Sequence, residues 1–451
     1  MDKFDFIIVG AGSAGCTLAS RLSENGKYSV CILEAGPKDT NPWIHVPIGY
    51  AKLFHNKKLN WMYKTKDDDG WIKRSIPAPR GKVLGGSSSI NGMIYIRGQK
   101  EDYNTWRQLG NTGWSYDDVL PYFKKSEIQE RGEDDYHGSN GNLHVQDHRD
   151  KHPLADAYVE AAVDEGYERN NDFNGEKQDG FGHFQWTQNK GRRWSAAKAY
   201  LEEAKKRKNI TIITDALASK ILFKNKTAVG IEYISKGKTL KVEANKEVIL
   251  SLGAFNSPQL LQLSGIGNKE ILQKYNIESV HELKGVGENL QDHINAPIMY
   301  ELNKPFTAND VFHKLHVRIG AGLNYILNRK GLLHMGVAYS GGFFKTDQSL
   351  ETPDIQSYMF VKENITNAVE VELTNSEDSR LVETGVETFI KWIRSGKLKI
   401  HAYPSQNIHA KLYIMTPKEG SLDDGRVITG SSNFSQSGLS TNLEFNVELK
   451  K

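Results

Sequence analysis

The stretch FDFIIVGAGSAG, residues 4–15, decides the fold of this chain. It begins as a short apolar run of the kind that forms a buried parallel strand, and it leads directly into a glycine-rich loop. A helical stretch, CTLASRLSEN (16–25), and a second apolar run, SVCILEAG (29–36), follow it. This order predicts a β-α-β unit at the start of an α/β fold.

The three glycines of the loop have different predicted tasks. Gly10 permits the tight turn, Gly12 lets the backbone approach a pyrophosphate, and Gly15 allows the helix to pack closely on the strand. Ser13 and Ala14 lie between the second and third glycines, next to the helix, whose N-terminus supplies the positive end of its dipole. We therefore predict that these five residues bind the phosphates of a dinucleotide.

Glu34 closes the second predicted strand and is placed to accept hydrogen bonds from the ribose hydroxyls of that dinucleotide. Glycines at this spacing also serve ordinary turns, so the prediction depends on the strand, the helix and the acid all being in place. The unit alone does not decide between FAD and NAD.

Length and charge set limits on the whole chain. Its 451 residues predict two or three domains, and 58 basic against 55 acidic side chains leave a net charge of +3. Charges this balanced give no excess of basic residues that would indicate nucleic-acid binding. The two cysteines, Cys16 and Cys31, argue against a disulfide framework and for a reducing compartment. No apolar run approaches the ~18 residues of a membrane span, and strand residues begin at Phe4 where a signal peptide would lie, so we expect a cytoplasmic protein.

Four longer stretches carry a family resemblance. They are RGKVLGGSSSINGMIYIRG (80–98), GAFNSPQLLQLSGIG (253–267), GVGENLQDH (285–293) and TPDIQ (352–356). Together they resemble the glucose-methanol-choline (GMC) oxidoreductases, and most of all bacterial choline or alcohol dehydrogenases. The resemblance covers roughly residues 1–360. It implies FAD as the cofactor and a primary alcohol such as choline as the substrate, and it leaves the alcohol, the electron acceptor and the choice between dehydrogenase and oxidase open.

The resemblance also assigns cofactor contacts. Gly85, Gly86 and the serines from Ser87 make a small loop, rich in hydrogen-bond donors, that could lie against the pyrophosphate or the flavin. Relatives that attach the flavin covalently carry a histidine where this chain has Ile90, so we expect FAD to bind noncovalently. The stretch ITIITDALASKILF (210–223) predicts one strand, from which the backbone of Ala218 would contact the adenine. The remaining predicted cofactor contacts are Arg80, Val83, Asn91, Gly92, Met93, Ile94, Ser251 and Gly253.

The catalytic residues of the family have no counterpart here. In the family, a histidine near the C-terminus, with a histidine or asparagine partner, takes the alcohol proton as hydride moves to the flavin. Nothing after Gln356 resembles that segment. We assign no catalytic residue to the oxidoreductase and no metal site, and we interpret Asp292 and His293 as structural residues beside the cofactor. Alcohol oxidation is therefore expected to be impaired.

From about Lys362 the chain resembles the phospholipase D-like domain of certain bacterial helicases. His409 and Lys411 alternate along the predicted strand NIHAKLYIM, so both would point to one face, as a nucleophilic histidine and a phosphate-binding lysine must. Asn433 lies in VITGSSNFS, whose small polar groups suit phosphate oxygens. That superfamily builds its site from two such motifs, and this chain has one, so activity would need a homodimer.

The sequence predicts three parts. Residues 1–295 form an FAD-binding Rossmann-type region with substrate-domain insertions near 150–190, residues 296–360 a truncated segment of the substrate domain, and residues 362–451 a partial phospholipase D-like α/β unit. The seam near 357–364 has no linker composition, which favours a gene fusion, natural or artefactual. Two alternatives to the oxidoreductase stay open: a phosphodiesterase or nucleic-acid-processing module, and an inactive fusion product.

Overall fold

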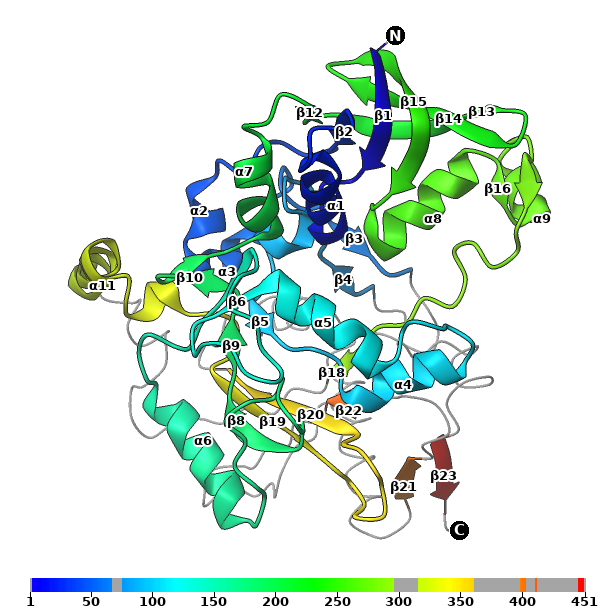
Figure 1. Cartoon of the computed structure of the whole chain (residues 1–451). Coiled ribbons are helices and arrows are strands. Elements are labelled where there is room, and N and C mark those ends of the chain that lie inside the picture. The colour runs from blue at the N-terminus through cyan, green and yellow to red at the C-terminus, as the bar shows by residue number, and fades with distance from the viewer. Residues whose placement is uncertain are drawn as a thin grey trace, which may run out of the picture.

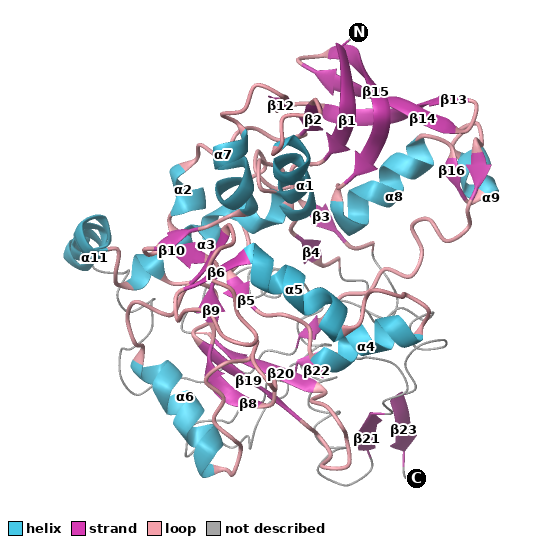
Figure 2. Ribbon diagram, viewed as in Figure 1, coloured by secondary structure: helices cyan, strands magenta, loops and turns pink. Residues whose placement is uncertain are grey.

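The computed structural model of this protein describes residues 2–66, 75–295, 315–360, 398–402, 410–411 and 445–449 (Figure 1). Its two main sheets lie in different parts of the molecule, the larger one near the N-terminus and the smaller one near the C-terminus (Figure 2). None of the helices in these described residues is long and apolar enough to cross a membrane.

The larger sheet is mixed. Its strands, in spatial order, are β12 (Ile210–Ile213), β2 (Val30–Leu33), β1 (Asp2–Val9), β15 (Lys238–Leu250), β14 (Thr227–Ser235) and β13 (Leu217–Lys224). The first four are parallel to one another, whereas β14 and β13 continue the sheet as an antiparallel meander. The order of the parallel strands is that of a nucleotide-binding α/β unit, with β1 in its interior.

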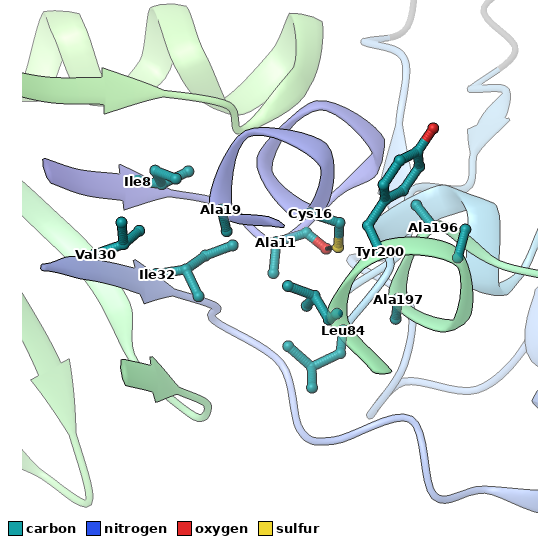
Figure 3. Packing of buried hydrophobic residues seen from close by; sticks show 12 residues of the cluster. Ile8, Ala11, Cys16, Ala19, Val30, Ile32, Leu84, Ala196, Ala197 and Tyr200 are labelled. Atoms are coloured by element: carbon teal, nitrogen blue, oxygen red, sulfur yellow. Dashed lines mark hydrogen bonds between the residues drawn. The ribbon is translucent and has the colours of Figure 1, made fainter. Parts of the chain in front are cut away.

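Alternating side chains of the parallel strands fill two cores. Ile8, Val30 and Ile32 point to the face covered by helix α1 (Ser13–Ser23) and the π-helical segment η4 (Ala197–Leu201), as Figure 3 shows. Ile7, Val9, Cys31 and Leu33 belong to the cluster on the opposite face, where Leu260 of helix α8 (Gly253–Leu263) packs. Burial on both faces explains why residues 6–9 of β1 and the whole of β2 are continuous apolar runs rather than alternating ones.

Both cysteines are buried and unpaired. Cys16 belongs to the α1 core and Cys31 to the α8 core, so the sheet separates them. Burial raises the pKa of the Cys31 thiol to about 12 and raises that of Cys16 further still. They act as small apolar core residues.

The smaller sheet joins segments that are far apart in the sequence. Its strands are β18 (Ile294–Asn295), β22 (Ala410–Lys411), β20 (Ile355–Met359), β19 (Ser340–Phe344) and β8 (Gly180–His183). Helix α6 (Pro153–Asp164) packs against β8 and β19, with Pro153 at its first turn where the missing N–H has no intrahelical partner to lose. Strand β8 and helix α6 come from the region where the substrate-domain insertion was predicted.

The other described strands form pairs of their own: β3 (Tyr63–Lys64) with β4 (Pro77–Ala78), β5 (Ile94–Tyr95) with β9 (Gln185–Trp186), β6 (Glu127–Gln129) with β7 (Leu143–Val145), β10 (Gln188–Asn189) with β11 (Arg192–Arg193), β16 (Ile266–Gly267) with β17 (His281–Glu282), and β21 (Leu398–Ala402) with β23 (Phe445–Leu449). The remaining helical elements are α2 (Pro42–His45), η1 (Pro47–Gly49), α3 (Tyr50–Leu53), η3 (Gly86–Ser89), α4 (Lys100–Gln108), α5 (Tyr116–Ser126), α7 (Glu202–Ala204), α9 (Lys269–Lys274), α11 (Leu315–Asn328) and η5 (Leu332–His334). Helix α5 begins with a capping box, in which Ser115 and Asp118 each accept the other's backbone N–H.

The stretch at 210–223, predicted as one strand, forms two. Asp215 adopts the left-handed conformation with φ +53°, which ends β12 and turns the chain into β13. The backbone N–H of Asp215 donates to the carbonyl oxygen of Gly36 at 2.9 Å, so the loop after β2 fixes the turn. A contact with Gly36, which is distant in the sequence, therefore determines where β12 ends and β13 begins.

Candidate functional site

The three glycines after β1 differ in what surrounds them. A Cβ added at Gly10, whose φ is +96°, would lie 2.6 Å from the carbonyl oxygen of Ser251, and one added at Gly15 would lie 1.9 Å from the carbonyl oxygen of Gly10. A Cβ at Gly12 would meet nothing nearer than 3.9 Å. The first and third glycines are thus required by packing, whereas the second is not crowded and lies at the N-terminus of α1, where phosphate groups bind.

The predicted second loop, which begins at Arg80, closes over the first. The backbone N–H of Gly85 donates to the carbonyl oxygen of Ala11 at 2.8 Å. A Cβ added at Gly86, with φ +55°, would lie 2.7 Å from the Cα of Gly12. Two glycine-rich loops from different parts of the chain therefore meet backbone to backbone at Gly12 and Gly86.

Glu34 ties the end of β2 to the same loop. Its side-chain oxygens accept hydrogen bonds from the backbone N–H groups of Ala11 and Gly36, both at 2.9 Å. Burial raises the pKa of its carboxyl group to about 7, although these two hydrogen bonds act in the opposite direction. Each carboxylate oxygen keeps a further lone pair, so the group can still accept hydrogen bonds from ribose hydroxyls.

Two of the three serines in the second loop are used internally. The hydroxyl of Ser88 donates to the carbonyl oxygen of Gly85 at 2.5 Å, and that of Ser89 donates to the carbonyl oxygen of Leu84 at 2.7 Å. Ser87 is exposed, and its hydroxyl oxygen accepts a bond from the N–H of Gly81 at 3.1 Å. The Ser87 hydroxyl proton is left for a ligand, in line with the cofactor contact predicted for this residue.

The loop continues through a strained segment. Met93 is 1 % exposed and has φ +69°, a conformation that is costly for a side chain of this size. A Cβ on Gly92 would lie 2.4 Å from Cγ1 of Val337. Ile94 follows in β5, which pairs with β9 and so links the predicted flavin contacts to the region of the smaller sheet.

Arg193 supports this segment and was not predicted. It is 2 % exposed, and it donates from Nε to the carbonyl oxygen of Ile44 at 2.8 Å and from Nη1 to that of Ser88 at 3.1 Å and to Oδ1 of Asn91 at 2.8 Å. Its Nη2 has no hydrogen-bond partner in the described part of the chain. Burial lowers the pKa of the guanidinium to about 9. In the sequence it is one of two adjacent arginines, a pattern more typical of a solvated surface.

The other predicted contacts lie around the same loops. The Ser251 N–H donates to the carbonyl oxygen of Val9 at 2.8 Å, which places Ser251 beside the glycine turn, and Gly253, with φ +78°, begins α8 with nothing within 4 Å of an added Cβ. Val83 is fully buried. Ala218 lies in the edge strand β13, which has β14 on one side only. Ala216, not predicted, donates its N–H to the carbonyl oxygen of Glu34 at 2.9 Å.

Arg80 joins three of the stretches that carry the family resemblance. Its guanidinium lies 4.4 Å from the ring centre of Phe255, and its Nη2 lies 3.6 Å from Oδ2 of Asp292. A groove of about 750 Å³ is lined by Tyr63, Phe255 and residues 287–291. The start of α8 and the GVGENLQDH stretch therefore border one groove, and Arg80 of the second loop contacts both of these segments.

A second ionisable cluster lies elsewhere, at helix α5 and the loops beside it. The two ring nitrogens of His137 each lie 2.8 Å from a carboxylate, that of Glu127 and that of Asp172. Burial lowers the pKa of His137, but the hydrogen bonds and charges of these two acids raise it to about 9. Arg97 also pairs with Glu127 at 2.8 Å. Asp134, His137 and Asp172 come close enough together to hold a metal ion, yet both imidazole nitrogens already have acid partners.

Most of the predicted phospholipase D-like site lies outside the described residues. His409 and Asn433 lie outside the described residues, and for Lys411 the backbone alone is described, in strand β22. Their predicted convergence stays a prediction.

Comparison with protein families agrees with this geometry. The family model described as GMC oxidoreductase matches residues 4–295, which include both glycine-rich loops, Glu34 and the start of α8. The chain belongs to the GMC oxidoreductase family. A second family model, described as cardiolipin synthase, PLD-like domain, matches residues 347–451. The resemblances predicted for the two parts of the sequence are confirmed.

Known GMC proteins resemble the first part of the chain. The alcohol dehydrogenase [acceptor] of Pseudomonas putida is 46 % identical over 356 residues, which are 78 % of this chain and 64 % of that protein. The oxygen-dependent choline dehydrogenase of Rhizobium etli is 45 % identical over 352 residues, with the same coverage of 78 % and 64 %. The mitochondrial choline dehydrogenase of Mus musculus is 42 % identical over 362 residues, 79 % of this chain and 61 % of that one. The chain spans less than two thirds of the length of these relatives.

Solved structures with this fold are oxidases and oxidoreductases. Pyridoxine 4-oxidase from Mesorbium loti superposes with a TM-score of 0.69 at 29 % identity, covering 78 % of this chain and 65 % of that one. An FAD-dependent oxidoreductase from Chaetomium thermophilum superposes with a TM-score of 0.70 at 29 % identity, covering 75 % and 61 %. A formate oxidase superposes with a TM-score of 0.70 at 25 % identity, covering 95 % and 72 %. The predicted α/β fold of a GMC oxidoreductase is confirmed.

Proposed function

We propose that this protein is an FAD-dependent oxidoreductase that acts on the CH–OH group of a small primary alcohol, choline or a similar one. The observation that carries the proposal is the contact of Gly86 with Gly12 at the N-terminus of α1, in the loop to which Glu34 is hydrogen-bonded. The alcohol and choline dehydrogenases among its relatives, at 46 % and 45 % identity, support the substrate class.

The residues at this site fit FAD. A Cβ at Gly12 would meet nothing nearer than 3.9 Å, so the pyrophosphate can approach the backbone there. Glu34 has spare acceptor capacity for the ribose, and Ser87 has a free hydroxyl proton for a phosphate oxygen. We propose that the bound flavin lies along Asn91–Ile94. Ile90 is 1 % exposed, and it offers no nucleophile for a covalent bond, so FAD is held noncovalently.

When bound, FAD accepts the hydride that leaves the alcohol carbon. The chain's own residues bind and orient the cofactor. Glu34 binds the ribose, and Arg193 holds the side chain of Asn91 and the carbonyl group of Ser88 in place. The family's histidine base has no counterpart in the sequence after Gln356. These residues belong to the stretch 347–451, which matches the phospholipase D-like family model. We propose that the protein binds FAD but oxidises alcohols slowly, because removing a general base typically reduces rates ~10²–10⁴-fold.

Flavin absorbance of the purified full chain tests the proposal. Acid precipitation should release all of the flavin into the supernatant, in a ratio near one per chain. Folded protein without flavin would refute the oxidoreductase, and flavin that stays with the precipitate would refute noncovalent binding. Turnover of choline at the ~10 s⁻¹ of ordinary enzymes would show that a base has been missed.

The family match at residues 347–451 favours one further activity. We propose a phosphodiesterase in which His409 is the nucleophile, Lys411 and Asn433 hold the phosphate, and two copies of the chain complete the site. Hydrolysis of bis-p-nitrophenyl phosphate by the wild type, lost in His409→Ala, would support it. Equal hydrolysis by both would refute it. The three-part division of the chain at residues 295 and 361 and the cytoplasmic location also stay proposals.

A further inference from the structure

Within the described part of the chain, helix α11 is attached to the rest of the protein through the side that carries Tyr325. Tyr325 is its buried residue, and the tyrosine hydroxyl donates hydrogen bonds to the carbonyl oxygens of Gly191 at 3.1 Å and His45 at 3.5 Å. Figure 1 shows the helix at the edge of the molecule, away from both sheets. The opposite side of the helix therefore faces outward.

That outward side is apolar. The exposed fractions of Leu315, Ile319, Leu323, Ile326 and Leu327, hereafter the α11 stripe, are 68 %, 55 %, 54 %, 64 % and 76 %. At about 100° per residue, these side chains cover an arc of roughly 120° on the side away from Tyr325. A helix that is apolar on both sides ordinarily has a partner on both sides, and a contiguous exposed apolar patch marks an interaction site.

The charges around the stripe are all of one sign in the sequence. Residues 311–346 contain no aspartate or glutamate, whereas two cations are exposed: Arg318, which flanks the stripe on the side of Tyr325, and Lys330, which follows the end of the helix. Asp150 approaches from another described segment, and its carboxylate accepts a hydrogen bond from the N–H of Gly331. Arg318 and Lys330 thus make the surface around the stripe positively charged, which favours an anionic partner.

A second copy of the chain is a poorer partner than a lipid surface. Two copies joined through this face would place their arginine and lysine side chains together, which is unfavourable for like charges. The stripe is about 18 Å long and one helix wide, roughly 10 Å, whereas a stable interface buries ~800 Å² on each partner. A bilayer surface instead accepts the apolar side chains at the acyl boundary and pairs the cations with phosphate groups.

We propose that helix α11 docks the protein on anionic lipid surfaces, with the α11 stripe inserted below the headgroups and Arg318 and Lys330 contacting lipid phosphates. The helix lies in the plane of the membrane surface, because its Tyr325 side stays bonded to the protein. This inference concerns a surface outside the FAD site, so it does not depend on the proposed oxidoreductase function.

Vesicle cosedimentation of the full chain tests the proposal. Vesicles of phosphatidylcholine with phosphatidylglycerol should bind the wild type, and binding should weaken as salt is raised. Ile319→Ser/Leu323→Ser should reduce the binding constant at least about tenfold, because buried apolar groups supply the insertion energy. The matched control is Leu109→Ser/Leu283→Ser, which changes residues that are 76 % and 50 % exposed away from the stripe, and it should bind like the wild type.

A charge variant gives a second readout. Arg318→Ser/Lys330→Ser should lose the preference for vesicles with phosphatidylglycerol over those of phosphatidylcholine alone. The proposal is wrong if the wild type binds neither kind of vesicle, or if the control weakens binding as much as the stripe variant. It is also wrong if sedimentation shows a wild-type dimer that only the stripe variant dissociates, since the stripe would then bind a second copy.

Discussion

Glu34 shows at the scale of one residue how a binding group can be held ready without a ligand. Its carboxylate accepts the N–H groups of Ala11 and Gly36, and these bonds fix its direction at the end of β2. Glu34→Ala should weaken FAD binding by about 1–3 kcal/mol, because the ribose hydroxyls lose a charged acceptor. Flavin titration measures this. Glu203→Ala, on an exposed acid paired with Lys206, is the control and should leave the affinity unchanged.

Equal FAD affinity of Glu34→Ala and the control would contradict the ribose contact. If Glu34→Ala and the control bind FAD equally well, Glu34 serves only to close the turn between β2 and the glycine loop. The thermal midpoint of the variant without flavin, measured in parallel, separates this structural effect from the ribose contact.

The His137 cluster predicts a pH dependence of stability. The pKa of His137 is raised from 6.5 to about 9 in the folded protein, so the folded state binds the proton more tightly than the unfolded state. The resulting stabilisation is complete below about pH 6.5 and is lost as the pH rises through 9; its full size is on the order of 3 kcal/mol. Denaturant unfolding at pH 6 and pH 9.5 should show a larger loss in the wild type than in His137→Gln. His281→Gln, at an exposed site, should behave as the wild type does.

At the scale of elements, the site depends on the contact between two loops. A methyl group at Gly86 would lie 2.7 Å from the Cα of Gly12 and would push the loops apart. Gly86→Ala should therefore lower FAD affinity at least about tenfold. It should also lower the free energy of unfolding by ~1–2 kcal/mol, because a side chain in the left-handed conformation is strained. Gly113→Ala is the matched control, because Gly113 also has a positive φ, +85°, but an added Cβ there has nothing within 4 Å. It should lose stability and keep its FAD affinity.

The elements that could be predicted are those with local signals. The β-α-β start was predictable because burial on both faces makes residues 6–9 of β1 and the whole of β2 continuous apolar runs, and because Gly10, Gly12 and Gly15 stand at the spacing of a nucleotide-binding loop. Arg193 could not be found in this way, because its partners Ile44 and Asn91 are about 150 and 100 residues distant in the sequence. The division of 210–223 into β12 and β13 was missed for the same reason, since Gly36 fixes the turn.

At the scale of the whole molecule, the phospholipase D-like match includes a strand of the smaller sheet. The phospholipase D-like match begins at residue 347, yet β20 (Ile355–Met359) pairs along its full length with β19 of the smaller sheet. Tyr158 of α6 also donates a hydrogen bond to the hydroxyl of Ser357 at 2.7 Å. The seam predicted at 357–364 therefore starts within a strand that belongs to the oxidoreductase fold.

This geometry predicts where the chain can be divided. Limited proteolysis of the full chain should yield an N-terminal fragment that ends beyond Met359 and keeps its FAD, because the hydrogen bonds of β20 protect the peptide bonds of residues 355–359 from a protease. Mass spectrometry gives the end of the fragment, and its flavin absorbance gives occupancy. Early cleavage before Ser357 would show that β20 is not held by β19. A fragment that ends beyond Met359 but loses its flavin would show instead that residues after the seam help to close the FAD site, and that the two parts share one core.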